Sequence, residues 1–235
     1  MTSSSPRMRH DTGTGTLLVD VIGDVAVVTF NNPGKRNALS SEMRAALPGL
    51  LEALQADREV RVVVVTGAGN VFSAGFDLDE FGRLGEPEFA AGLWASSDRW
   101  HRTVLEFPLP VVAAVNGAAY GGGFDLAVMC DLRIASTSAR FAHPEHAFSQ
   151  VVYAPLHDLV GGAVARDLAL TGRVVDAEEA KTLGLVTRVV PEDELLDDAV
   201  AVAREIARAP RAVLLRMKEK ISLRAGIRFG ATLDL

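Results

Sequence analysis

Short runs of apolar, mostly branched residues alternate along the chain with stretches of mixed polarity. Several of these runs are apolar at every position rather than at every second one. Strands that are buried on both faces show this pattern, and they occur in parallel or mixed sheets covered by helices. The four strands that the pattern predicts are residues 25–30, 60–66, 111–115 and 132–136.

Apolar residues at helical spacing fill the intervals between these runs. From Met43 to Leu54 they recur three or four positions apart behind a cap at Ser40 or Ser41, and Pro48 is expected to bend this helix. Strands that alternate with helices favour a layered α/β architecture. The other predicted helices are residues 94–105, 124–130, 195–208 and 211–224.

The composition fits a folded protein with a sizeable core. The 235 residues include 24 Lys and Arg against 30 Asp and Glu, a net charge of −6, and 49% are hydrophobic. This profile excludes a disordered chain, and the lack of clustered basic residues argues against a nucleic-acid partner. The longest apolar run, residues 108–130, contains prolines, three consecutive glycines and Asp125, so we expect no membrane span.

The N-terminus and the cysteine content bear on location. Residues 1–16 carry positive charge with no apolar stretch behind it, which predicts a flexible tail rather than a secretory signal. The single cysteine, Cys130, cannot form an internal disulfide, and its apolar surroundings predict a core residue. We therefore expect a cytoplasmic protein.

Two glycine-rich segments are candidates for ligand contact. Residues 67–72 follow a predicted strand, but Phe72 stands where a dinucleotide-binding fingerprint has glycine, so an ordinary turn is the better interpretation. Residues 116–125 lead through Gly121, Gly122 and Gly123 into a predicted helix, whose free N–H groups can hold an anion. Tight helix packing, with Asp125 complementing the helix dipole, is the alternative.

The segment His143-Pro144-Glu145-His146 places a carboxylate between two imidazoles. No matching ligand pair occurs elsewhere, so we expect no metal site, and surface histidines are the simpler interpretation. Glu145 follows Asp125 by 20 residues. Two carboxylates can share acid and base work if the fold brings them together.

Several motifs together resemble the enoyl-CoA hydratase/isomerase family, also called the crotonase family. The resemblance spans about residues 17–210 and rests on NPGKRNALS, FSAGFDLDE, AAVNGAAYGGGFDLAVMCDLRIAS, FAHPE and LALTGRVVDAEEAKTLGLVTRVV, in that order. It implies an α/β fold in which ββα units repeat in a spiral, followed by C-terminal helices that build trimers, which often pair into hexamers. It also implies a coenzyme A thioester as ligand, with no separate cofactor.

The resemblance assigns roles at the reaction centre. The backbone N–H groups of Phe76 and Gly122 would polarise the thioester carbonyl as an oxyanion hole. Glu145 would be the main acid/base, and Asp125 would orient or activate water. Asp125 stands where family hydratases have glutamate, which sets its carboxylate back by about 1.5 Å. The resemblance places the CoA thioester against Lys35, Arg36, Ala38, Ala74, Asp77, Leu78, Gly121 and Tyr153.

Two further departures concern the pocket and the chain end. Residues 146–159 differ from the glycine-rich loop that shapes the acyl pocket in relatives, and the C-terminus stops earlier than usual. We expect three regions: a flexible tail over 1–16, the spiral core with the active site over 17–192, and a shortened helical region over 193–235. The predicted activity is reversible hydration of a 2-enoyl-CoA. Double-bond isomerisation and a catalytically silent acyl-CoA binding protein are the alternatives.

Overall fold

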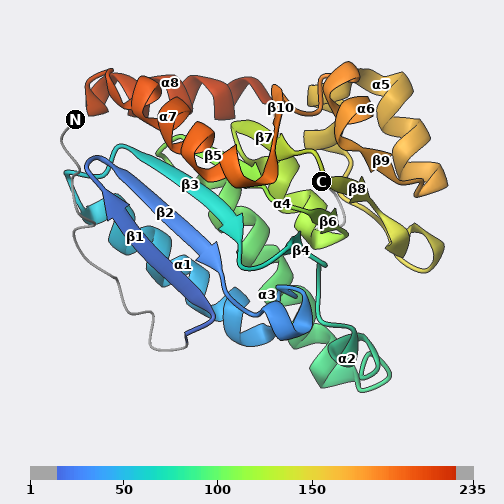
Figure 1. The fold of residues 1–235 in the computed structure, drawn as a ribbon. Helices are drawn as coiled ribbons and strands as arrows, with labels where there is room; N and C mark the ends of the chain where they lie inside the picture. Colours follow the sequence, from blue (N-terminus) through green and yellow to red (C-terminus); the bar gives the residue numbers. More distant parts are fainter. Residues whose placement is uncertain (1–14, 226–235) are drawn as a thin grey trace.

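The computed structural model describes residues 15–225, whose strands form two sheets (Figure 1). Most of the predicted tail, and residues 226–235 of the predicted C-terminal region, lie outside the described residues. The larger, six-stranded sheet is antiparallel only between its first two strands and parallel elsewhere. Its spatial order is β1 (Leu17–Ile22), β2 (Val25–Phe30), β3 (Val62–Gly67), β5 (Val111–Val115), β7 (Leu132–Ser136) and β10 (Arg188–Val190).

A smaller, four-stranded sheet holds the strands that follow β3, β5 and β7 in the chain. It is parallel except between its last two strands. These strands are too short for their sequence pattern to predict them. Its order is β4 (Val71–Ser73), β6 (Ala118–Tyr120), β8 (Arg140–Ala142) and β9 (Val175–Asp176).

The first unit, β1-β2-α1, has both strands in the larger sheet, and the next three units each place one strand in each sheet before a helix. This is the spiral of ββα units that the resemblance implies, and the predicted fold class is confirmed. The prolines and glycines between the units fall in the connections. The main helices are α1 (Ser41–Ala56), α2 (Leu78–Phe81), α3 (Pro87–Glu106), α4 (Gly122–Met129), α5 (Ala154–Thr171), α6 (Ala177–Thr182), α7 (Leu195–Ala207) and α8 (Arg211–Ala225).

Helices cover both faces of the larger sheet, as the continuously apolar strands predict. One face packs in the main core with α1 and α3, whereas the other face of β2, β3 and β5 packs against α7, which crosses the sheet in Figure 1. The cap of α1 is Ser40, whose hydroxyl accepts a hydrogen bond from the Met43 N–H. Cys130 is buried, and burial raises the pKa of its thiol to about 12, which agrees with a core residue.

No helix in the described part of the chain is long and apolar enough to cross a membrane. The boundary predicted near residue 192 stays a prediction. The helix that follows it, α7, packs against the larger sheet.

A buried ion pair attaches α8 to this core. The Lys218 Nζ lies 2.5 Å from Asp131 Oδ2, and only 5% of Lys218 is exposed. The same carboxylate oxygen accepts a hydrogen bond from the Val111 N–H at the start of β5. The pair therefore links the last described helix to the centre of the larger sheet.

We expect Lys218→Met to lower the free energy of unfolding by about 3 kcal/mol, because it leaves the buried Asp131 carboxylate without its counter-ion. Urea unfolding measures this loss. Lys220→Met is the matched control, since Lys220 lies on the exposed face of the same helix. Equal losses in the two variants would contradict the assignment.

Candidate active site

One cavity of about 640 Å³ collects almost all of the predicted site residues. It lies where the loops after β2, β4, β6 and β8 meet the middle of α3. Its volume is in the range of small-molecule sites. The predicted residues that line it are Lys35, Arg36, Ala38, Ala74, Phe76, Asp77, Leu78, Gly121, Gly122, Asp125 and Glu145.

Two backbone N–H groups lie close together in this cavity. A side chain on Gly75 would place its Cβ 3.0 Å from the Gly122 nitrogen and 2.7 Å from the Tyr120 oxygen, so the two loops touch through backbone atoms. Among the described residues, neither the Phe76 nor the Gly122 N–H donates to another protein group. Gly122 opens α4, where N–H groups have no partner within the helix. The arrangement offers two donors to a ligand oxygen.

The Glu145 carboxylate lies against Gly121, the residue before Gly122. A Cβ on Gly121 would lie 3.1 Å from Glu145 Oε2, and Gly121 has a φ of 53°, which glycine adopts without strain. Glu145 belongs to a short 3-10 turn, Pro144–Ala147. Its Oε2 is buried and has no hydrogen-bond partner among the described residues. An ionisable oxygen therefore lies beside Gly121, the residue before the free Gly122 N–H.

Asp125 and Glu145 both reach the cavity, as their predicted roles require, but an imidazole lies between them. His143 Nδ1 is 2.9 Å from Glu145 Oε1, and His143 Nε2 is 3.7 Å from Asp125 Oδ1. On the other side of Asp125, its Oδ2 is 3.7 Å from His101 Nε2. The two carboxylates are thus connected through His143.

The surroundings of His143 favour its protonated, positively charged form. Its side chain is fully buried, and burial by itself would lower its pKa. The hydrogen bond with Glu145 and the negative charges of Asp125 and Glu145 outweigh burial, so the pKa of His143 is raised. The expectation of surface histidines is therefore wrong for His143, although it holds for His146, which is exposed.

A raised pKa links His143 to stability. The protonated imidazole favours the folded state, and this contribution is complete below the ordinary histidine pKa of about 6.5. It is lost as the pH rises through the raised pKa of the folded protein.

We therefore expect the difference in melting temperature between the wild type and His143→Gln to be largest near pH 6. It should shrink as the pH approaches 9. Thermal unfolding of both proteins across this range checks it. A difference that stays constant with pH would contradict a charged His143.

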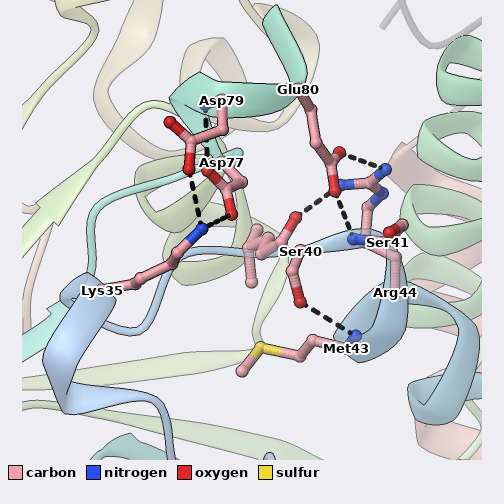
Figure 2. A network of polar contacts seen from close by, with 9 residues as sticks. Lys35, Ser40, Ser41, Met43, Arg44, Asp77, Asp79 and Glu80 are labelled. Carbon is pink, nitrogen blue, oxygen red and sulfur yellow. Dashed lines mark hydrogen bonds and ion pairs between the residues drawn. The ribbon is translucent and has the colours of Figure 1, made fainter.

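The predicted ligand contact Lys35 takes part in an ion-pair network at one wall of the cavity (Figure 2). Its Nζ lies 2.8 Å from Asp77 Oδ2 and 2.9 Å from Asp79 Oδ2. Burial opposes ionisation of Asp77, but the hydrogen bonds from Lys35 and from the Asp79 N–H lower its pKa. Arg36 forms no ion pair with the described residues and is exposed, so it is the free cation of this wall.

Arg44 of α1 holds the same wall from behind. Its guanidinium is almost fully buried and bonds Glu80 of α2 at 2.8 Å and Ser96 of α3 at 2.7 Å. It also donates to the Leu39 carbonyl and lies 4.8 Å from the centre of the Phe76 ring. Leu39 forms a parallel β-bridge to Phe76. Arg44 therefore fixes the strand segment that carries one of the two free N–H groups.

We expect Arg44→Leu to lower the free energy of unfolding by about 3 kcal/mol. The substitution leaves the Glu80 carboxylate without its counter-ion and the Leu39 carbonyl without the hydrogen bond from Arg44. Denaturant titration measures it. Arg83→Gln is the control: it breaks the exposed Arg83–Glu86 pair, whose loss should not change the midpoint measurably. A similar shift in both variants would show that the Arg44 network is not special.

Tyr153 is the predicted site residue that does not line the cavity. It lies just before α5, packs against the core, and its ring is 5.6 Å from that of His157. Residues 148–152 of the altered loop do line the cavity, with Phe148 exposed and packed edge-on against Phe81. His157 and Asp158 are exposed polar residues.

Motif reasoning missed three buried side chains that shape the site: His101, His143 and Arg44. His101 and Arg44 lie in helices whose apolar spacing gives no sign of them. His143 was visible beside Glu145, but its burial depends on the packing of its ring against Phe124, 4.7 Å away. No group of three or more His, Cys, Asp or Glu in the described residues is arranged to hold a metal ion.

Known proteins resemble this chain in sequence and in structure. The model of the enoyl-CoA hydratase/isomerase family matches residues 21–228. A protein of Thermus thermophilus whose provisional name is enoyl-CoA hydratase is 43% identical over 208 residues, covering 86% of this chain and 82% of its own.

The solved structures that resemble this chain include a hydratase and an isomerase. An enoyl-CoA hydratase from Bacillus anthracis superposes with a TM-score of 0.84 at 33% identity, covering 93% of this chain and 86% of its own. A monofunctional enoyl-CoA isomerase from M. smegmatis gives 0.78, also at 33% identity, covering 91% and 95%.

Proposed function

Because the chain belongs to the enoyl-CoA hydratase/isomerase family, we propose that it adds water reversibly across the 2,3 double bond of an enoyl-CoA. The observation that carries the proposal is one cavity that holds the Glu145 carboxylate, against Gly121, and the free N–H groups of Phe76 and Gly122. The family acts on acyl-CoA thioesters. Coenzyme A is part of that substrate, so the proposed chemistry needs no separate cofactor.

The two N–H groups would receive the thioester oxygen. As water adds to the β-carbon, negative charge moves onto this oxygen, and the resulting enolate is stabilised by two donors that are already in place. Glu145 then delivers a proton to the α-carbon, which restores the carbonyl. The water loses a proton as its oxygen bonds to the β-carbon, and a carboxylate of the site accepts it, so the site returns to its starting protonation. Asp125 and Glu145 are the two carboxylates that line the cavity.

The walls of the cavity suit the two ends of an acyl-CoA. Phe81, Trp94 and Phe148 offer an apolar surface to the acyl chain. The CoA arm would pass Lys35, Arg36, Ala38, Ala74, Asp77 and Leu78. Lys35 is already paired with two aspartates, so Arg36 is the cation we assign to the CoA phosphates.

Isomerisation of a 3-enoyl-CoA is the second candidate. It needs one carboxylate to move a proton between two carbons, and His143 separates Asp125 from Glu145 here. Assembly into a trimer or hexamer, and a cytoplasmic location, belong to the same proposal. The exposed apolar residues Val213, Met217 and Ile221 on α8 suit an oligomer contact.

We expect the purified protein to convert a 2-enoyl-CoA into 3-hydroxyacyl-CoA that carries oxygen-18 from labelled water. Glu145→Gln should lower turnover by about 10² to 10⁴-fold, because the general acid is lost, while acyl-CoA binding stays near normal. Mass spectrometry over a panel of short to long 2-enoyl- and 3-enoyl-CoAs measures product and label.

Glu192→Gln is the matched control, since this glutamate is exposed on a short turn outside the cavity. Retained activity in Glu145→Gln would overturn the proposal. Bond migration without label would replace hydration by isomerisation, and tight binding without turnover across the panel would identify a silent acyl-CoA binding protein.

A further inference from the structure

Four ionisable side chains form a line that leads from the cavity into the core. The order is Glu145, His143, Asp125 and His101, with successive separations of 2.9, 3.7 and 3.7 Å. They come from the 3-10 turn that carries Glu145, the residue just before that turn, α4 and α3. The hydration chemistry assigns roles to the two carboxylates and none to the imidazoles.

The hydrogen bonds of His101 restrict where protons can lie. Its Nδ1 is 2.8 Å from the Ser97 carbonyl oxygen, which only accepts, so Nδ1 carries the proton. In the neutral ring Nε2 is then a bare acceptor, and it faces Asp125 Oδ2. A lone pair on Nε2 offers the carboxylate no stabilisation, so with a neutral His101 the charge of Asp125 is balanced from its other side.

That other side is His143. Its Nδ1 is within hydrogen-bond distance of Glu145, and its Nε2 faces Asp125 Oδ1. A ring protonated at both nitrogens offers a donor to each carboxylate, whereas a neutral ring leaves one carboxylate facing a lone pair. Phe124 packs on the ring, with the two ring centres 4.7 Å apart.

Burial makes this balance necessary. Asp125 is 6% exposed and His143 is 1% exposed, and Asp125 Oδ1 and the Nε2 atoms of both histidines lack hydrogen-bond partners among the described residues. An unpaired charge in such surroundings costs several kcal/mol. The titratable groups that face His143 are Asp125 from α4 and Glu145 from the 3-10 turn, while His146 bonds only its carbonyl.

We propose that Asp125 acts on Glu145 through His143: Asp125 holds the imidazolium, and His143 supplies and takes back the proton that Glu145 exchanges with the α-carbon. The proton moves from Nδ1 to Oε1, and the N–H electron pair stays on Nδ1. After Glu145 has protonated the α-carbon, its carboxylate takes the proton that the adding water releases and returns a proton to Nδ1, so the site ends each turnover as it began. The ring keeps its Nε2 proton, which remains directed at Asp125. His143 is a positioning residue, since it reaches the substrate only through Glu145.

This inference rests on the proposed role of Glu145 as acid/base, and it accounts for the short side chain at position 125. A counter-ion has to reach His143 and not the substrate. The Nε2 to Oδ1 separation of 3.7 Å is the distance of an ion pair and not of a hydrogen bond, which suits a counter-ion.

The first test measures the pKa of His143 by nitrogen-15 NMR in the full chain with labelled histidine, and it needs no activity. Asp125→Asn and Glu145→Gln should each lower this pKa, because each removes a negative charge that faces the ring. His146→Gln, in the same turn, should leave it unchanged. An unaltered pKa in Asp125→Asn would overturn the proposal.

The second test is a double-mutant cycle on turnover. His143→Gln should lower kcat about 10- to 100-fold with little change in KM, as is usual when the group that orients a catalytic residue is lost. If Asp125 acts only through His143, Asp125→Asn should add no further loss in the His143→Gln background. Effects that multiply would show that Asp125 acts directly on water, which overturns the inference and leaves hydration standing.

The two proposals can fail separately. If no enoyl-CoA gains label, hydration is wrong. The same cycle is then run on exchange of the α-proton of a saturated acyl-CoA in deuterated water, which needs only Glu145 and the two N–H groups. The NMR result decides the link between Asp125 and His143 in either case.

Discussion

The site depends on a backbone approach that only glycine permits. A Cβ on Gly75 would collide with the Tyr120 carbonyl, and one on Gly123 would lie 2.3 Å from the Ser73 oxygen. Real Cβ atoms do not approach backbone that closely, so a larger residue at either position would force the loops apart. Since Phe76 and Gly122 lie on these two loops, their N–H groups converge only while both glycines are present.

Loops that touch through backbone atoms have few side chains to hold them, and polar neighbours supply the missing constraint. Asn37, fully buried with a left-handed φ of 53°, donates to the carbonyls of Ala68 and Val71 and accepts from the Asn32 N–H. Two residues later Leu39 forms the bridge to Phe76, which Arg44 secures. Within the NALS motif, the asparagine therefore fixes the turn between β3 and β4, and the leucine fixes the loop after β4.

The sequence predicts the parts of this molecule that obey a period. The strand at 25–30 is found unchanged as β2, and the helix behind Ser40 is found with that cap, because burial on two faces and helical spacing leave clear patterns. The strands of the smaller sheet have two or three residues, which is too few for any period. Their positions follow only from the repeat of the spiral.

The site residues also divide into those that a sequence pattern predicts and those that it does not. The family motifs named Asp125 and Glu145, and both residues line one cavity because the order of the motifs follows the fold. His143, His101 and Arg44 were missed because their importance lies in burial and in partners far away in sequence. Arg44 bonds Glu80 and Ser96, 36 and 52 positions away, and no local pattern announces such contacts.

The spacing of charges along the line bears on which reaction the cavity can support. A water molecule held directly between two carboxylates needs both of them at the substrate, but here one oxygen of Asp125 faces His143 and the other faces His101. Only Glu145 presents an unpartnered carboxylate oxygen beside Gly121. Proton transfer at the α-carbon is thus assigned to one residue, and hydration differs from isomerisation by whether water reaches the β-carbon. Residues 148–152 form part of the cavity wall, and they lie within residues 146–159, the segment that the sequence sets apart from the family motifs.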